Sequence, residues 1–274
     1  MDTTVHNIVL VGAGNVATHL GTALKQKGHG IIQVFSRTIE SARKLADRLD
    51  TKSITNLTEL DYSADIYLFC LKDDVLQDVL KQTTFTNQIL VHTSGSLALN
   101  VFKGFGNQFG VIYPVQTFNS NREIDLSNVP FCIEANTSYA ESILVKLASG
   151  LSRKVQIVDS EKRKIVHLAA VFACNFTNHM YLLANRLIHE NGLDFDLLKP
   201  LIQETAAKIL EMDPETAQTG PAKRGDNLIL EDHVQLLKDL PGMQKIYTFV
   251  SESIAQTASC KKNNRRENSD KRRT

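Results

Sequence analysis

The stretch Val9-Leu10-Val11-Gly12-Ala13-Gly14-Asn15-Val16-Ala17 decides the fold. It sets a glycine-rich turn between an apolar run, typical of a buried strand, and a helical pattern. Gly12 permits a tight turn and Gly14 lets a pyrophosphate approach the backbone, while the free amides at the helix start carry partial positive charge. Asn15 and Val16, which open the helix, are assigned to the same site. The stretch predicts a dinucleotide-binding corner; the alternative is a glycine turn with a purely structural role.

Ser36, Arg37 and Thr38 follow the next predicted strand, 31–35, where this type of fold puts residues beside the adenosine ribose. No acidic residue stands there to accept hydrogen bonds from the ribose hydroxyls of NAD. An arginine flanked by hydroxyl groups suits the additional phosphate of NADP. We therefore expect NADP as the cofactor, with a solvated Arg37 at a helix start as the alternative.

Strands alternate with helices through the first half of the chain, the pattern of a doubly wound, mostly parallel α/β sheet. After residue 159 the strands stop and the pattern is helical. We predict a Rossmann-like dinucleotide-binding domain at 1–158 and an all-helical substrate and dimerisation domain at 159–258. The predicted strands are 8–11, 31–35, 53–55, 66–71, 88–92, 109–113, 131–134 and 155–158, with helices at 16–27, 39–49 and 138–149.

The composition excludes several classes of protein. With 274 residues, 42% of them apolar and 22% charged, the chain suits a globular protein of two domains. No apolar run approaches the roughly 18 residues that span a bilayer, and no signal segment is recognised, so we expect a cytoplasmic protein without a membrane partner. The scattered cysteines form no CxxC pair, and neither an HxxxH pair nor an acidic cluster occurs, so no metal site is predicted.

Residues 259–274 hold seven Lys or Arg against two acidic residues, although the whole chain has a formal charge of only +1. Such a polar segment buries too little apolar surface to order itself, so we predict a disordered basic tail. Binding of nucleic acid by this tail is not favoured, because no aromatic side chains interleave with the charges.

A long helix is predicted from a cap at Asp159 and Ser160 to Asn191, with Gly192 beyond its end. It is rich in Ala, Phe, Leu and Val nearly all round. A helix of this kind must be covered on several sides. We expect a homodimer, with a second subunit supplying part of that cover.

One face of this helix carries polar groups, because at 100° per residue Lys164, His167, Val171, Asn175 and Asn178 form a single stripe. Histidine is the member of the stripe whose ordinary pKa lies near neutrality. We predict His167 as the catalytic proton donor, with Asn175 and Asn178 orienting the substrate. The alternative is that His167 makes a structural hydrogen bond between the domains.

Two loops follow predicted strands and point to the same edge of the sheet, where ligands of open α/β sheets bind. One loop contains Leu71 and Lys72, and the other contains Thr93, Ser94 and Gly95. Small hydroxyl residues and a glycine let the backbone approach a nicotinamide closely. We assign all five to the cofactor; an ordinary turn cluster is the alternative.

A second candidate loop lies in the helical half, at 219–226. Its Arg224 has the forked geometry that binds a carboxylate, and Thr219 offers a hydroxyl group. Both are predicted to bind substrate. A solvated arginine in a helix connection is the alternative.

Taken together, GAGNVA, SRT, HTSGS, YPVQTF, the run from His167 to Phe176 and TGPAKRGD resemble a bacterial family. That family joins a Rossmann-like domain to domain of unknown function 2520, and the resemblance covers about residues 5–255. It resembles an offshoot of the superfamily of pyrroline-carboxylate reductase and 6-phosphogluconate dehydrogenase, which implies an NADP-binding domain, a helical dimerising domain and a cleft between them. Hydroxyacid dehydrogenases of that superfamily carry a Lys four residues before an Asn. Aligning the Asn with Asn175 puts Val171 in the lysine position, so their mechanism cannot be transferred. His167 or Lys164, earlier on the same stripe, would have to supply the proton, unless the pocket works without a side-chain acid.

The leading hypothesis is an NADP-dependent oxidoreductase that reduces a small ketone or imine bearing a carboxylate. The alternative is a sensor or scaffold that binds NADP without turnover. Only the enzyme needs a proton donor beside the nicotinamide.

Overall fold

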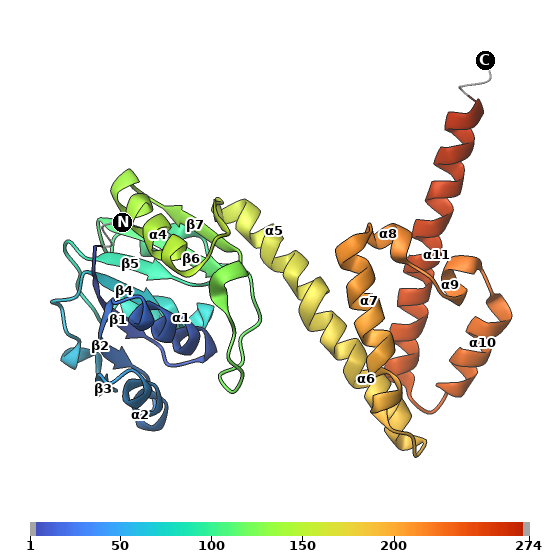
Figure 1. The fold of residues 1–274 in the computed structure, drawn as a ribbon, viewed down its shortest axis with the longest axis horizontal. Helices are drawn as coiled ribbons and strands as arrows, with labels where there is room; N and C mark the ends of the chain where they lie inside the picture. Colours follow the sequence, from blue (N-terminus) through green and yellow to red (C-terminus); the bar gives the residue numbers. More distant parts are fainter. Residues whose placement is uncertain (1–3, 271–274) are drawn as a thin grey trace. The chain divides into compact units, whose positions relative to one another are not determined.

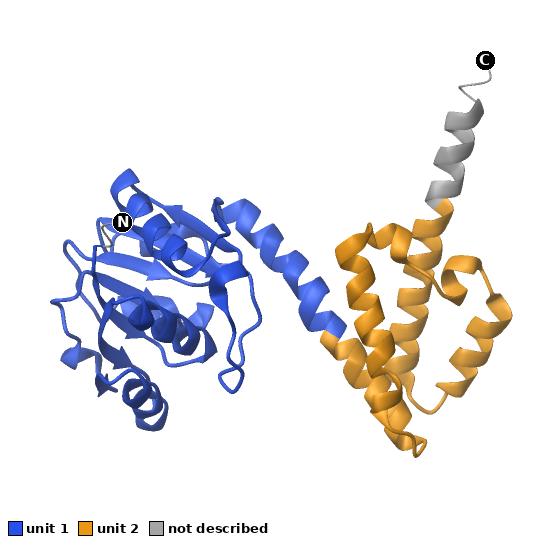
Figure 2. Ribbon diagram, in the orientation of Figure 1, with its two compact units in different colours: residues 1–177 blue, residues 178–274 orange. Residues whose placement is uncertain are grey.

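The computed structural model describes residues 4–270, with side chains up to residue 259. The chain divides into two compact units, residues 1–177 and 178–274 (Figure 2). The predicted boundary at residues 158 and 159 follows another criterion, the change from strands to helices, and stays a prediction. The predicted basic tail, 259–274, lies outside the described side chains apart from Ser259, so its disorder also stays a prediction.

The first unit is built on an eight-stranded sheet with the order β3-β2-β1-β4-β5-β6-β7-β8 (Figure 1). Strands β1 to β6 run parallel, β7 pairs antiparallel with β6, and β8 is parallel to β7. The fold class predicted from the sequence is confirmed. The strands are β1 (Asn7–Val11), β2 (Gly30–Phe35), β3 (Lys52–Ile54), β4 (Ile66–Phe69), β5 (Ile89–His92), β6 (Gln108–Pro114), β7 (Phe131–Ala135) and β8 (Val155–Ile157).

Both faces of the sheet are buried, which is why its central strands read as continuous apolar runs. On β1, Ile8 and Leu10 join one core and Val9 and Val11 join the other. The first core packs against α1 (Asn15–Gln26), α2 (Ile39–Arg48) and α4 (Ser138–Leu151), and the second packs against α3 (Asp73–Leu80). The strand order reverses between β1 and β4, so the crevice for a ligand lies at the carboxyl ends of these strands.

The helical run of 160–190 starts where predicted but is not one regular helix. Asp159 caps it by accepting a hydrogen bond from the Lys162 amide at 2.8 Å. The run consists of α5 (Ser160–Ala170), a π-helical segment (Val171–Phe176) and α6 (Thr177–Glu190). A π segment bonds i to i+5 rather than i to i+4, so side chains beyond it leave the α-helical phase. The single stripe predicted through Asn175 and Asn178 assumed one regular α-helix, and the π segment interrupts that helix after Ala170; both asparagines are exposed.

Arg163 on the first turns of α5 is fully buried in the first unit. Its guanidinium forms an ion pair with Glu134 on β7 and donates to the Leu97 carbonyl in the loop after β5. Ser160 joins this cluster, because its hydroxyl donates to Glu134 at 2.8 Å and accepts from the Leu99 amide at 2.9 Å. The cluster ties α5 to the sheet.

The second unit contains helices with little buried surface of their own. Ala222 and Leu237 are the only side chains that it buries, among those described. Its helices are most of α6, α7 (Lys199–Glu211), α8 (Pro214–Ala217), α9 (Pro221–Arg224), α10 (Asn227–Leu236) and α11 (Pro241–Asp270). Within residues 4–270, no helix has both the length and the apolar character needed to cross a membrane.

We expect Arg163→Ala to lower the free energy of unfolding by about 3 kcal/mol or more, because it leaves the Glu134 carboxylate without its buried partner. Urea unfolding measures the change. Lys164→Ala is the matched control on the same helix. Its ammonium pairs with Glu161 at the surface, so we expect a loss of about 1 kcal/mol at most. Equal losses for the two variants would contradict the assigned role of Arg163.

Candidate functional site

The glycine corner lies between β1 and α1, and its two glycines have different reasons to be glycine. Gly12 has a φ of 117°, and a Cβ atom on it would lie 2.4 Å from the carbonyl oxygen of Cys70. The fold alone therefore requires Gly12. Gly14 has a φ of −83°, and a Cβ atom on it would meet nothing within 4 Å. No neighbour requires this glycine, as expected if the space in front of it is kept for a ligand.

The start of α1 is suited to an anion. Gly14 is the N-cap residue, and no side chain caps the helix or places an acid in its first turn. Helix amides without side-chain acceptors, together with the helix dipole, favour a phosphate group at such a terminus. The corner thus fits the pyrophosphate of a dinucleotide both by shape and by charge.

A first pocket, here called the Arg37 pocket, has a volume of about 440 Å³. It lies at the carboxyl ends of β2 and β3, beside α3. Four apolar side chains share its walls with polar ones, among them Arg37 and Asp78, which suits a flat heterocycle joined to a polar, charged group. It is lined by Phe35, Arg37, Thr55, Asn56, Leu57, Val75, Asp78, Val79 and Gln82.

A second pocket, here called the His167 pocket, has a volume of about 410 Å³ and lies on the other side of the glycine corner. It gathers residues that follow β1, β4 and β5 with Tyr113 from β6 and His167 from α5. Segments that are far apart in the sequence therefore meet at one edge of the sheet. It is lined by Gly14, Asn15, Val16, Cys70, Leu71, Lys72, Asp73, Thr93, Ser94, Gly95, Ser96, Tyr113 and His167.

His167 is held in this pocket by two contacts. Its Nδ1 atom lies 3.1 Å from the Tyr113 hydroxyl oxygen, with which it shares a hydrogen bond. On its other side a Cβ atom on Gly95 would come within 2.7 Å of the imidazole ring, so only a glycine allows this approach. Burial is the main cause that raises the pKa of Tyr113 above its usual value, which keeps the phenol protonated at neutral pH.

The loop after β5 is fixed by its own hydrogen bonds. Burial lowers the pKa of His92 to about 3, so its ring is neutral, and its Nδ1 accepts from the Ser94 amide at 3.2 Å. The Ser94 hydroxyl accepts from the amide of Ser96 at 3.1 Å, and the Ser96 hydroxyl donates to Asp73 at the start of α3. The wall of the pocket beside His167 is thereby rigid.

Cys70 also lines the His167 pocket but is no nucleophile. Burial raises the pKa of its thiol to about 12, so it stays protonated at neutral pH. Among the described residues, no three His, Cys, Asp or Glu side chains gather as a possible metal site.

Most residues that the sequence assigned to the cofactor lie around these two pockets. Arg37 lines the Arg37 pocket, while Thr38 donates to the Ser41 hydroxyl at 2.9 Å and Ser36 precedes them at the end of β2. Gly12 lies behind the corner, against Cys70. The His167 pocket is lined by Gly14, Asn15, Val16, Leu71, Lys72, Thr93, Ser94 and Gly95.

The other predicted catalytic and substrate residues are not among those that line the His167 pocket. Asn175 is exposed on the π segment of the first unit. Asn178, Thr219 and Arg224 belong to the second unit, where Asn178 and Thr219 are exposed. The Arg224 guanidinium is already engaged, because its Nε and a terminal nitrogen bind Asp226 at 2.8 and 2.6 Å.

Sequence reasoning did not assign Tyr113, Asp73 or Ser96 to the site. Tyr113 had a usable signal, since it ends a predicted strand whose carboxyl end faces the same edge as the other loops. Asp73 and Ser96 flank assigned residues, and only their mutual hydrogen bond marks them.

Comparison with known proteins identifies both halves of the chain. Residues 7–95 match the family described as NADP oxidoreductase, coenzyme F420-dependent, and residues 129–254 match domain of unknown function 2520. No protein in the curated set matched this chain.

Three solved structures have similar folds. A protein of Bacteroides fragilis, whose assignment as an NADP oxidoreductase is itself provisional, is 46% identical, with a TM-score of 0.87 over 92% of this chain and 98% of its own. A Thermotoga maritima protein is 26% identical, with a TM-score of 0.69 over 93% and 99% of the two chains. A 1-pyrroline-5-carboxylate reductase of Streptococcus pyogenes, 15% identical with a TM-score of 0.62 over 93% and 99%, shares the fold alone.

The resemblance inferred from the motifs is thus confirmed over nearly the whole chain. This chain belongs to the family that joins an N-terminal domain of the F420-dependent NADP oxidoreductase type to a C-terminal domain of unknown function 2520.

Proposed function

We propose that this protein is an NADP-dependent oxidoreductase that reduces a small ketone or imine bearing a carboxylate. The observation that carries this proposal is the arrangement of the two pockets, which flank the glycine corner along one edge of the sheet. A dinucleotide has two bases joined by a pyrophosphate, and this edge offers two pockets joined by an anion-binding helix start. Membership of an NADP oxidoreductase family supports the same cofactor.

The parts of the cofactor are assigned by chemistry. The amides at Asn15 and Val16 hold the pyrophosphate, the Arg37 pocket takes the adenosine end, and the His167 pocket takes the nicotinamide end together with the substrate. Bound NADPH supplies a hydride to the substrate. The loop of Thr93, Ser94 and Gly95 limits the space beside that end, because it forms one wall of the His167 pocket.

His167 is the proposed proton donor. When protonated, His167 carries a hydrogen on both ring nitrogens: Nδ1–H donates to the Tyr113 hydroxyl oxygen, and Nε2–H is left for a substrate atom in the pocket that His167 lines. After the proton is transferred, the ring is neutral and keeps its hydrogen bond to Tyr113. Tyr113 is thus a positioning residue that sets the orientation of the ring.

The substrate carboxylate is assigned to Lys72, which the sequence analysis assigned to the cofactor. This residue lines the His167 pocket and has no ion pair within the described part of the chain. Arg224, the residue predicted from the sequence, would first have to exchange Asp226 for the substrate. The orienting role of Asn175 and Asn178 has less support, since both side chains are exposed.

The direct test is a screen of 2-ketoacids and cyclic imines for oxidation of NADPH by the purified protein. Tight binding of NADP without turnover of any member of this set would favour the alternative, a sensor or scaffold.

The two glycines of the corner give a matched pair of variants. Gly14→Ala is expected to fold normally and to bind NADP at least tenfold more weakly, because its methyl group would occupy the space in front of the corner. Gly12→Ala is expected to lose about 1–3 kcal/mol of stability from backbone strain, with a further loss from the clash with Cys70. Calorimetry and thermal unfolding measure the two effects. Unchanged NADP binding in Gly14→Ala would place the cofactor elsewhere.

His167→Ala is expected to lower turnover by roughly 10²–10⁴-fold with little change in NADP affinity, because a general acid is lost while the cofactor contacts remain. Steady-state kinetics and calorimetry measure this. Tyr113→Phe should lower turnover less and shift its pH profile, since only the orientation of the ring is lost. His189→Ala, an exposed histidine of α6, is the control. Normal turnover in His167→Ala would rule out its role as proton donor.

We also propose that the protein acts as a homodimer. The second unit buries only two of its described side chains, too few to stabilise a helical unit alone. Large apolar side chains that it leaves exposed are Leu182, Leu193, Leu197, Leu201, Ile209, Leu210, Leu228, Leu236 and Phe249. The α5 helix and the π segment add Ile165, Leu168 and Phe172. A second copy would cover such surfaces.

Sedimentation at micromolar concentration is expected to give a dimer. Phe172→Glu should weaken it, because a charge would be buried in the contact. Tyr139→Glu on α4, which changes an equally exposed aromatic side chain (63% for Tyr139 and 62% for Phe172), is the control. A wild-type monomer with a well-ordered helical unit would contradict the proposal.

A further inference from the structure

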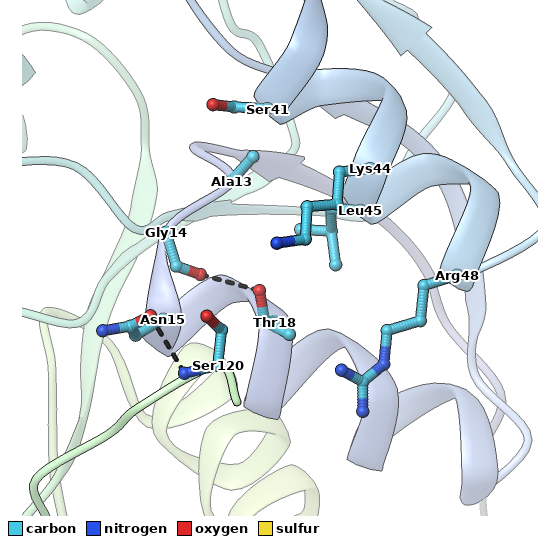
Figure 3. A pocket seen from close by; sticks show the side chains of 9 residues that line it. All are labelled: Ala13, Gly14, Asn15, Thr18, Ser41, Lys44, Leu45, Arg48 and Ser120. Atoms are coloured by element: carbon cyan, nitrogen blue, oxygen red, sulfur yellow. Dashed lines mark hydrogen bonds between the residues drawn. The ribbon is translucent and has the colours of Figure 1, made fainter. Parts of the chain in front are cut away.

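A third cavity, of about 210 Å³, lies between α1 and α2 in the first unit and is distinct from the two pockets described above (Figure 3). Gly14 and Asn15 at the start of α1 form one wall. Ser41, Lys44 and Arg48, which follow one another along one side of α2, form the opposite wall. This cavity, here called the α1–α2 cavity, therefore begins at the glycine corner and continues down between the two helices.

The α1–α2 cavity is positively charged. Figure 3 shows the Lys44 and Arg48 side chains extending into the space between α1 and α2. Neither cation has an ion pair or side-chain hydrogen bond within residues 4–259, and no carboxylate lines the cavity. The free start of α1 adds its partial positive charge. Two unpaired cations facing a helix terminus favour an anion.

Ser41 supplies a directed donor at the upper end of this cavity. Its hydroxyl oxygen accepts a hydrogen bond from the Thr38 hydroxyl at 2.9 Å. The hydrogen of Ser41 is therefore left to donate to another acceptor. Because Thr38 directly follows Arg37, this hydrogen bond joins the loop after β2 to the wall of the α1–α2 cavity.

Arg37 itself does not line the α1–α2 cavity; it lines the Arg37 pocket. The loop of residues 36–38 thus has Arg37 on the side of the proposed adenosine pocket, while Ser41 and Lys44 of the following helix α2 lie on the side of the glycine corner. A phosphate on the adenosine ribose, next to this loop, would be reached from both sides.

We propose that Ser41 and Lys44 of α2 bind the 2′-phosphate of NADP and so determine the preference for NADP over NAD, while Arg48 raises the positive potential from further along the cavity. This inference rests on the proposed NADP site. It extends the recognition of the phosphate from the loop of Ser36, Arg37 and Thr38 to a second element, and it separates the role of Lys44 from that of Arg37.

The test is calorimetric titration of the full-length protein with NADP, NAD and adenosine 2′,5′-bisphosphate. Lys44→Ala should weaken binding of NADP and of the bisphosphate about tenfold, or about 1.4 kcal/mol, and leave NAD binding unchanged. Lys44→Arg should restore most of the loss. Arg43→Ala, which removes a neighbouring exposed cation that does not line the cavity, should change neither affinity by more than about twofold.

Three outcomes overturn the inference. An equal loss of NAD and NADP binding in Lys44→Ala would assign Lys44 to the pyrophosphate. An equal loss in Lys44→Ala and Arg43→Ala would reveal only a general charge effect. Unchanged binding in Lys44→Ala would exclude the α1–α2 cavity from the site. In each of these cases the wild-type protein still binds NADP, and the proposed function stands. If the wild-type protein binds neither dinucleotide, the proposed function itself is contradicted.

Discussion

A buried cation at the start of α5 fixes the position of the helix that carries His167. Arg163 has no exposed surface, so its charge must be met inside the protein, and Glu134 and the Leu97 carbonyl are the groups that meet it. Glu134 belongs to a strand and Leu97 to the loop after β5, so satisfying one guanidinium fixes α5 against both. His167 lies one turn further along the helix, on the same side. The contacts of His167 with Tyr113 and Gly95 depend on this anchor.

The two glycines of the corner are constrained in different ways. Gly12 is required by the fold, because any side chain would collide with the Cys70 carbonyl group. No neighbour among the described residues requires Gly14 to be a glycine. A larger side chain at Gly14 would meet no neighbour, and the position lies at the uncapped start of a helix. A bound ligand, rather than packing in the core, then explains why the residue is a glycine. This difference between Gly12 and Gly14 supports a dinucleotide site. A match to the glycine motif alone would not separate the two roles.

The two units differ in how they are stabilised. The first has two apolar cores, one on each face of its sheet. The second leaves most of its large apolar side chains exposed. Under the proposed function this difference corresponds to two tasks: the sheet edge of the first unit would carry the chemistry, and the helices of the second unit would supply the surface for association.

The sequence by itself determined the features that depend on local patterns. Apolar runs predicted the strands, because a parallel sheet buried on both faces leaves no polar alternation, and the glycine spacing predicted the corner. Asp159 was predicted as a cap because its residue type favours the start of a helix, and its hydrogen bond with the Lys162 amide confirms this. The tertiary structure decided what depends on distant partners. The Arg163 contact with Glu134 and the His167 contact with Tyr113 join residues 29 and 54 positions apart, and no local signal encodes them. The π segment, which contains Asn175, was not predicted either, because the apolar period of the sequence gives no signal for a change from i to i+4 to i to i+5 hydrogen bonding.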